Sequence, residues 1–232
     1  AKPRKEDLRL ENRITSLLQA NKDPDIMYAR SAGKGLFKSK DRGETWAAVN
    51  NGLTTPDALA VRSVAVHPKN SSIVLRGGGA VVNGVLKSGL WKSTNGGESW
   101  RLITRDIGFD GRGPATLFGE VIAFGPFDPN VVLAGGETNG LFLSLDAGET
   151  WKCVGMTEER ITCMTYGPPT RKGDPRNPTL LVGTFADTEF ATLGMGKPVS
   201  QLNNRGGVWS FLRMPNKERK LMPRLRRDHD IE

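Results

Sequence analysis

An eight-residue motif occurs three times in this 232-residue chain, and it constrains the fold more than any other feature. Its copies occupy residues 39–46, 93–100 and 144–151 and share the pattern S-x-[DN]-x-G-E-[ST]-W. The spacing is 54 residues from Asp41 to Asn95 and 51 from Asn95 to Asp146. Self-similarity with a period near 50 residues is typical of repeat architectures, β-propellers among them. We call the three copies the motif turns.

Each position of the motif has a physical role. The Asp or Asn side chain bonds the backbone two residues on and closes a tight turn, and the Gly permits positive φ. The Thr or Ser and the Trp resume an extended strand, and the Trp ring buries a large area against a neighbouring repeat. We therefore interpret the acidic positions as turn formers rather than catalytic acids. The structural residues are Ser39, Asp41, Gly43, Thr45, Trp46, Ser93, Asn95, Gly97, Ser99, Trp100, Ser144, Asp146, Gly148, Thr150 and Trp151.

The motif turns resemble the Asp-box, or BNR, repeat of the sialidase, sortilin and photosystem II assembly factor-like superfamily. That resemblance implies a sialidase-like all-β propeller, with the motif on the hairpin between the third and fourth strands of each blade. It implies function only weakly, because the superfamily includes hydrolases, receptors and assembly factors. It also favours an exported protein, either periplasmic or extracellular, although no signal peptide begins at Ala1.

Four repeats of four strands are expected. The first, innermost strands are placed at residues 14–19, 61–67, 120–124 and 161–166, and the third strands begin with a Gly, an aliphatic residue and an aromatic residue. Residues 6–18 also fit an amphipathic helix, but the repeat register favours a strand from Ile14 onward. The predicted division is an N-terminal extension at 1–12, propeller repeats at 13–212 with blades at about 13–50, 61–104, 119–155 and 160–212, and a basic tail at 213–232.

The fourth repeat is irregular, because residues 211–216 contain none of the Asp, Gly and Trp positions of the motif. Its fourth strand is absent, comes from residues 220–225, or comes from residues near the N-terminus. Propellers have typically four to eight blades. Three arrangements are therefore open: a four-bladed ring, a partial ring completed by a second copy or another subunit, and an arc whose open edges a partner covers.

Composition excludes several classes of protein. No run approaches the roughly 18 apolar residues of a membrane span. His67 and His229 are placed in no arrangement that suggests a metal site. Gly77–Gly79 lacks the sequence of a phosphate loop and is predicted to be a bend in the loop between the second and third strands. No cofactor and no metal are therefore expected. Cys153 and Cys163 form no disulfide framework, although one bond between them is open. The net charge of +8 favours an acidic partner.

The loops between second and third strands, with the connections between blades, vary most in length and share one face. Loops on a rigid scaffold commonly carry binding residues, so this face is the candidate site. Glycoside hydrolysis normally needs two positioned carboxylates. The candidates for such a pair are Asp106, Asp110, Glu120, Asp187 and Glu189. Tyr28 and Tyr166 are expected in the core rather than as nucleophiles. The residues assigned to the face are Arg30, Arg76, Arg105, Asp110, Arg112, Glu120, Asp187 and Arg205.

Basic residues dominate the segment from 213 to 227, against Glu218 alone. A solvated tail, a docking arm for a protein partner, and contact with nucleic acid or anionic lipid all fit such a run. Nucleic acid is disfavoured because Phe211 is the only aromatic residue near it. The tail residues assigned to partner binding are Arg213, Lys217, Arg219, Lys220, Arg224, Arg226 and Arg227.

The sequence favours a non-catalytic binding or scaffold protein that is a subunit or assembly factor of a larger complex. Homo- or hetero-oligomers are expected because an irregular fourth blade leaves unpaired strand edges. Carbohydrate stays open as a ligand. The alternative is a sialidase- or endoglucanase-like glycoside hydrolase, or a fragment of one, and a carboxylate pair on the variable loop face would distinguish it.

Overall fold

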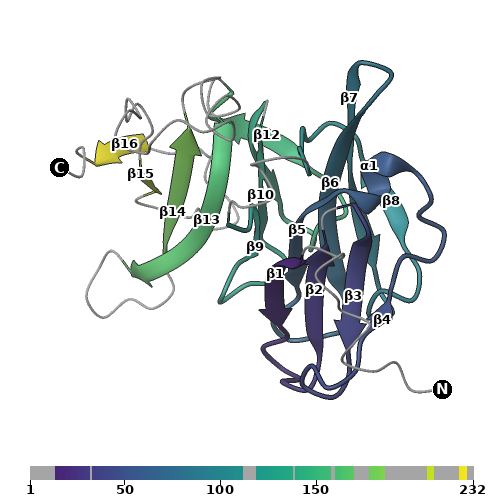
Figure 1. Cartoon of the computed structure of the whole chain (residues 1–232). Helices are drawn as coiled ribbons and strands as arrows, with labels where there is room; N and C mark the ends of the chain where they lie inside the picture. The colour runs from purple at the N-terminus through teal and green to yellow at the C-terminus, as the bar shows by residue number, and fades with distance from the viewer. Residues whose placement is uncertain are drawn as a thin grey trace, which may run out of the picture.

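Four antiparallel sheets of four strands each make up a β-propeller (Figure 1). The computed structural model describes residues 14–31, 33–111, 119–137, 139–157, 160–169, 178–185, 208–211 and 225–228. Each sheet runs in chain order from an inner to an outer strand, which confirms the predicted all-β architecture of four-stranded blades. No helix in these ranges is long and apolar enough to cross a membrane.

The first two sheets precede residue 105. The first contains β1 (Ile14–Gln19), β2 (Met27–Ser31), β3 (Gly35–Ser39) and β4 (Ala47–Ala48). The second contains β5 (Val61–Val66), β6 (Val74–Val82), β7 (Val85–Ser93) and β8 (Arg101–Thr104). A four-residue helix, α1 (Pro56–Leu59), lies in the connection between them. The strand at Ile14 agrees with the repeat register and not with a helix there.

The third and fourth sheets follow the same order. The third contains β9 (Ile122–Phe124), β10 (Val132–Gly136), β11 (Gly140–Ser144) and β12 (Lys152–Gly155). The fourth contains β13 (Arg160–Pro169), β14 (Pro178–Phe185), β15 (Val208–Phe211) and β16 (Leu225–Asp228). The last strand of the fourth sheet therefore lies inside the segment that the sequence suggested as a basic tail.

Successive sheets pack face to face around the inner strands. The first and second sheets share an apolar cluster that includes Tyr28, Leu36 and Val64. A larger cluster joins the second, third and fourth sheets and includes Leu75, Leu133 and Ile161. In Figure 1 the fourth sheet lies on the opposite side of the molecule from β3 and β4. The first sheet packs on the second through the apolar cluster that contains Tyr28.

The region around Gly77–Gly79 differs from the sequence prediction of a loop or bend. These glycines lie within β6, which pairs with β7 out to Val82 and Val85. A Cβ on Gly77 would lie 2.7 Å from the ring of Phe109, and one on Gly78 would lie 2.8 Å from the carbonyl oxygen of Ala60. The glycines are required because both inter-blade connections press against this strand.

Candidate functional site

Glu120 is the centre of a polar cluster where the inner strands meet. Its carboxylate accepts hydrogen bonds from the hydroxyl of Ser16 at 2.9 Å, and from the hydroxyl of Ser63 at 2.6 Å and the backbone N–H of Val64 at 2.8 Å. Its own carbonyl accepts the N–H of Met164 at 2.8 Å. Glu120, which precedes β9, thus bonds to the first, second and fourth sheets at once. We call Ser16, Arg30, Arg62, Ser63, Glu120 and Glu137 the inner-strand cluster.

Two buried arginines surround this carboxylate. Arg30 Nε lies 3.2 Å from Oε1 of Glu120, and Arg30 also donates to the carbonyl of Arg62. Arg62 is fully buried and donates to the carbonyls of Gly119 at 2.7 Å and Thr162 at 2.8 Å. Burial lowers the pKa of Arg30, and the neighbouring Glu120 opposes that shift. The arginines therefore join backbone groups of different blades.

Glu137 pairs with Arg62 in the interior. Its side chain is 1% exposed and accepts the Nε–H of Arg62. Burial raises the pKa of Glu137 to about 7 because desolvation outweighs the attraction of the guanidinium. A carboxyl group with this pKa is a candidate proton donor, but its partner and its burial make it part of the contact between blades.

Two of the arginines assigned to the loop face are buried instead. Arg30 is 2% exposed and Arg76 is fully buried. The guanidinium of Arg76 lies 5.9 Å from the ring of Trp91 and 5.2 Å from that of Trp100, and it donates to Asn50 Oδ1 at 3.2 Å. Burial lowers the pKa of Arg76 to about 9. Both arginines lie on strands facing a neighbouring blade, so they hold blades together and form no open ligand surface.

Of the other six residues assigned to the loop face, the structure describes three and leaves three outside the described ranges. Arg105 is half-exposed and binds Asp57 at 3.0 Å and the carbonyl of Ser88 at 3.0 Å, while Asp110 is partly buried. Glu120 is at the inner-strand cluster described above. Arg112, Asp187 and Arg205 lie outside the described residues.

Of the basic tail only Arg226 and Arg227 fall in a described element, β16, where they pair in register with Ser210 and Trp209.

The motif turns are tight turns, but the Asp or Asn side chain accepts the N–H four residues on and not, as expected, the one two residues on. In the first, Asp41 accepts the Thr45 hydroxyl at 2.6 Å and backbone N–H at 2.8 Å, and Ser39 accepts the N–H of Gly43 at 2.8 Å. The hydrogen bond from the Thr45 hydroxyl is the largest cause that lowers the pKa of Asp41, to about 2. Asp146 has the same bonds to Thr150, and although burial acts to raise its pKa, these bonds lower it to about 2. These carboxylates stay ionised and shape the turn.

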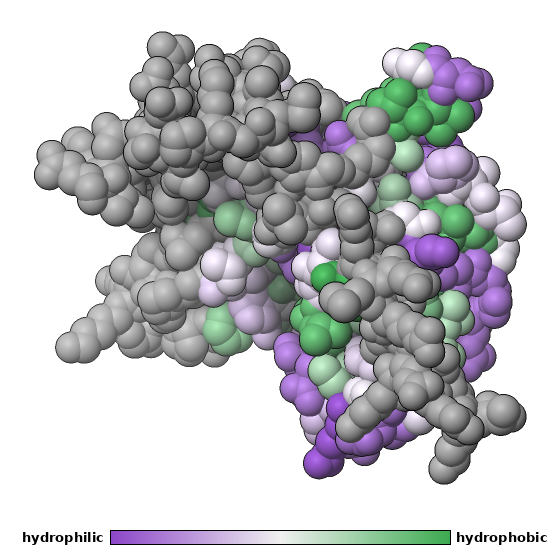
Figure 2. All heavy atoms as spheres, in the orientation of Figure 1, coloured by the Kyte–Doolittle hydropathy of each residue, from purple (hydrophilic) through white to green (hydrophobic). Residues whose placement is uncertain are grey.

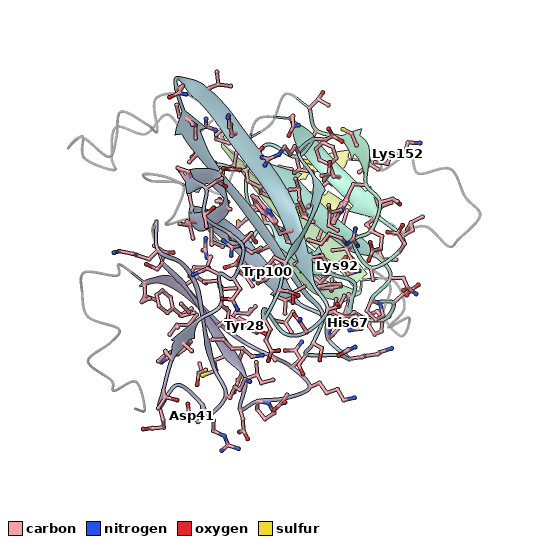
Figure 3. All side chains as sticks on the ribbon, turned by 90° about the vertical axis from the view of Figure 1, so that its right-hand side faces the viewer. Tyr28, Asp41, His67, Lys92, Trp100 and Lys152 are labelled. Carbon is pink, nitrogen blue, oxygen red and sulfur yellow. The ribbon has the colours of Figure 1, made fainter. Side chains whose placement is uncertain are left out.

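Two lysines that the sequence analysis did not single out join the motif turns to other blades. Lys38, in β3, donates to the carbonyl of Gly96 at 2.9 Å, and Lys92, in β7, donates to that of Ala147 at 2.8 Å. Tyr28 also donates to Gly96, at 3.1 Å, and Figure 3 shows Tyr28 and Trp100 between the first two sheets. The signal in the sequence is the residue that follows the aromatic position of each third strand, which is Lys in the first two repeats.

The loop face carries a projecting hairpin, residues 79–88. The tips of β6 and β7 extend beyond the rest of the second sheet and turn at Asn83 and Gly84, whose φ values are 53° and 79° (Figures 1 and 2). Val85 is 63% exposed and Val81 is 39% exposed. The hairpin is anchored at its base, where the Ser88 hydroxyl donates to the carbonyl of Ile107 at 2.9 Å.

Neither cysteine forms a disulfide. Cys153 and Cys163 are both free thiols and both exposed. The bond that the sequence left open between them is therefore absent, and the described part of the chain is held by packing and hydrogen bonds. In that part no group of three His, Cys, Asp or Glu side chains could hold a metal ion.

The chain is similar in sequence to xyloglucanases over part of their length. It is 28% identical over 137 residues to the xyloglucanase Xgh74A of Acetivibrio thermocellus, covering 57% of this chain and 16% of that protein. It is 26% identical over 212 residues to a xyloglucanase of Hypocrea jecorina, covering 79% of this chain and 24% of that protein. No protein-family model matches the chain. The chain therefore spans only a small part of the length of these relatives.

Solved structures support the fold. The GH74 xyloglucanase of Xanthomonas campestris superimposes with a TM-score of 0.64 and 17% identity, over 87% of this chain and 36% of that one. The GH74 enzyme of Niastella koreensis gives a TM-score of 0.62 and 15% identity, over 86% of this chain and 36% of that one. At these identities the likeness concerns the fold.

Proposed function

We propose that this chain is a non-catalytic β-propeller module that binds a protein partner through its loop face, as a subunit or assembly factor of a larger complex. The observation that carries the proposal is the projecting hairpin, which presents Val81 and Val85 to solvent on a well-paired two-stranded support. A pre-formed apolar projection loses little conformational entropy on binding.

The chemistry of the hairpin favours a protein over a sugar. Its tip carries valines on both sides of the ribbon, because Val82 and Val85 are register partners and Val81 pairs with Leu86. None of these residues is aromatic, so the tip offers no ring face. Valine side chains gain free energy by insertion into an apolar pocket of a partner.

The charged residues near the inner strands support a structural role. Glu120 accepts hydrogen bonds from two serines and one backbone N–H and lies beside Arg30. Glu137 is held by Arg62. Each of these groups contributes to contacts between blades, which favours a scaffold over a catalytic centre.

The test is retention of a partner by the folded chain. The double variant Val81→Ser/Val85→Ser should reduce retention of a co-purifying protein at least tenfold, because two exposed apolar contacts are lost. The control is Leu145→Ser, a substitution at another exposed apolar residue, 57% exposed, which should retain the partner. Equal retention by both variants would contradict the role of the hairpin.

Glycoside hydrolysis is the second candidate, favoured by the similarity to xyloglucanases. Glu120 is the first carboxylate to substitute and Asp110 the second. The test is turnover of xyloglucan by the chain. Turnover that Glu120→Gln or Asp110→Asn abolishes, with the fold intact, would show a glycoside hydrolase instead of a non-catalytic binding module.

A further inference from the structure

The dipeptide Asn-Gly occurs four times in the sequence, at residues 51–52, 83–84, 95–96 and 139–140. In this dipeptide the glycine nitrogen can attack the side-chain amide carbon of the asparagine, because glycine has no Cβ to obstruct the approach. The attack is favoured where the asparagine amide is free to turn and the glycine N–H donates no hydrogen bond. The four dipeptides differ in both respects.

The dipeptide at 95–96 is held on both sides. The Asn95 side chain accepts the N–H of Ser99 at 2.9 Å and donates to the Ser99 hydroxyl at 2.9 Å. The N–H of Gly96 donates to the carbonyl of Ser72 at 2.7 Å. Attack by the Gly96 nitrogen therefore requires local opening of the second motif turn.

The asparagines at 139 and 51 are held to different degrees. The Asn139 side chain accepts the N–H of Gly108 at 2.9 Å and donates to the carbonyl of Asp106, so both ends of its amide are bonded. Asn51 is exposed, and its amide donates to the carbonyl of Glu98 at 3.1 Å. Asn139 is therefore fixed in place, whereas Asn51 is held by one exposed bond.

Asn83 meets both conditions for the attack. It is exposed at the turn of the projecting hairpin (Figure 2), and in the described part of the chain its side chain has no hydrogen-bond partner. The Gly84 N–H donates to no group of that part either, and a Cβ on Gly84 would have nothing within 4 Å. The two positive φ values fit a type I′ turn, which is closed by the strand residues on either side, Val82 and Val85. The reacting atoms are therefore free while the turn around them stays formed.

We propose that Asn83 is a self-modification site that converts, without an enzyme, to aspartate or isoaspartate. The Gly84 nitrogen loses its proton and bonds to Cγ of Asn83. The Cγ–Nδ2 bond breaks, and the side-chain amide leaves as ammonia. The product is a five-membered succinimide ring that contains the Gly84 nitrogen.

Water opens the ring in the second step. Addition to the side-chain carbonyl carbon breaks its bond to the ring nitrogen and gives aspartate with the ordinary peptide bond. Addition to the main-chain carbonyl carbon gives isoaspartate, in which the main chain runs through Cγ. The whole conversion consumes one water and releases one ammonia, and nothing is oxidised or reduced.

Both products alter the tip of the hairpin. Isoaspartate lengthens the main chain by one carbon, so the two-residue turn no longer matches the twist of β6 and β7. Aspartate keeps the turn but places a negative charge between the exposed side chains of Val81 and Val85. A charge resists transfer into an apolar pocket. Conversion therefore opposes partner binding by the hairpin, a consequence that rests on the proposed function.

The experiment compares the full chain in its folded state and in concentrated urea, both in mildly alkaline buffer. Peptide mapping by mass spectrometry follows aspartate and isoaspartate at each site, and ammonia release is measured alongside. In urea the four dipeptides should react at similar rates. In the folded chain Asn83 should react fastest and Asn51 next. Asn95 and Asn139 should be slowed roughly tenfold or more relative to urea, because their hydrogen bonds must open first. Protection of Asn83 as strong as that of Asn139, or faster conversion of Asn51, would overturn the inference.

Two matched variants test the site in the folded chain. Asn83→Gly removes the reactive amide and keeps a sequence that favours the two-residue turn. It should abolish the fast phase of ammonia release, whereas Asn51→Gly should leave that phase intact. Incubation should also speed hydrogen exchange in residues 80–87 of the parent and not in Asn83→Gly. A fast phase that persists in Asn83→Gly would overturn the inference. If this variant does not fold, the comparison of the parent with and without urea decides.

Failure of this inference is distinguishable from failure of the proposed function. The conversion is measured on the chain alone, whereas the proposed function is measured by partner retention. In the retention experiment Asn83→Asp should lose the partner as Val81→Ser/Val85→Ser does, and Asn83→Gly should keep it. Equal retention by Asn83→Asp and the parent would overturn the effect on binding. Equal retention by the valine variant and the parent would contradict the hairpin as the binding element and leave the conversion at Asn83 standing.

Discussion

The first and second motif turns have the same local hydrogen bonds and different surroundings. In both, the serine accepts a glycine N–H at 2.8 Å, and the Asp or Asn accepts the N–H four residues on, at 2.8 Å in the first turn and 2.9 Å in the second. Gly97 of the second turn packs on Val49 of the first blade, whereas the nearest neighbours of Gly43 in the first turn are Trp46 and Met27 of its own blade. The motif sequence therefore builds the turn, and the neighbouring blade decides what the turn contributes to stability.

The largest expected effect is at the two tryptophans. Trp100 donates to the carbonyl of Val49 at 2.8 Å and lies against Arg76, whereas Trp46 donates to Gly43 within its own turn at 3.0 Å. Trp100→Ala should cost about 3–5 kcal/mol in unfolding free energy and Trp46→Ala less than half of that. Urea denaturation measures both, and equal losses would refute the difference between the turns.

The next largest effect is a pH dependence of stability that distinguishes the buried Glu137 from the carboxylates of the motif turns. Because the pKa of Glu137 is raised from 4.5 to about 7, the folded state binds its proton more tightly than the unfolded state does. This contribution is therefore fully present below pH 4.5 and is lost as pH rises to about 7, a change of about 3 kcal/mol. Unfolding free energies from pH 4.5 to 8 should show this decline, and Glu137→Gln should remove it. A variant that kept the parent slope would exclude Glu137 as its source, and the exposed Glu98→Gln is the control.

A smaller effect concerns the glycines of the turns. Gly43 and Gly148 have the same φ of 89°, so an alanine is strained equally at both. Only Gly148 has a neighbouring blade in contact, through Leu75. Gly148→Ala should therefore cost about 1–3 kcal/mol more than Gly43→Ala in thermal unfolding. An equal or larger cost at Gly43 would contradict the difference between the two turns.

The smallest effect is on the motif carboxylates. Asn95 already occupies the aspartate position of the second turn, so Asp41→Asn should change Tm at neutral pH by only about 2 °C. The pKa of Asp41 is depressed to about 2, so its contribution is present above pH 3.8 and is lost as pH falls toward 2. Asp41→Asn should weaken this loss in acid, in the direction opposite to that of Glu137. Calorimetry between pH 2 and 5 measures the Tm of both proteins. If the Tm of Asp41→Asn falls in acid as steeply as that of the parent, Asp41 is not the source of the acid dependence.

The repeats of the sequence predicted much of the fold because the motif turns are local structures. Asp41 and Asp146 form the turns with residues at most four positions away, and the alternating strands follow from the glycine, aliphatic and aromatic pattern of each third strand. The prediction that Gly77–Gly79 form a loop failed for the opposite reason. These glycines extend a strand because Phe109 and Ala60, both distant in sequence, press against them.

The candidate site was predicted less well, since burial depends on neighbours that the sequence does not identify. Arginine is a residue type that commonly binds ligands, but Arg30 and Arg76 are buried by the adjacent blade. Glu120 was singled out as a charged residue, whereas its hydrogen bonds to Ser16 and Ser63 join residues 104 and 57 positions apart. Arg62 and Glu137, 75 positions apart, gave no local signal at all.

The sequence by itself determined the turns, the repeat length and the four-stranded sheets, because these depend on hydrogen bonds and side-chain alternation within a few residues. Only the tertiary structure decided which face of each sheet is covered, which lysines meet a turn carbonyl and which carboxylates are buried. Those properties arise from desolvation when two blades meet, and the free energy of desolvation depends on what lies opposite a side chain rather than on its neighbours in the chain.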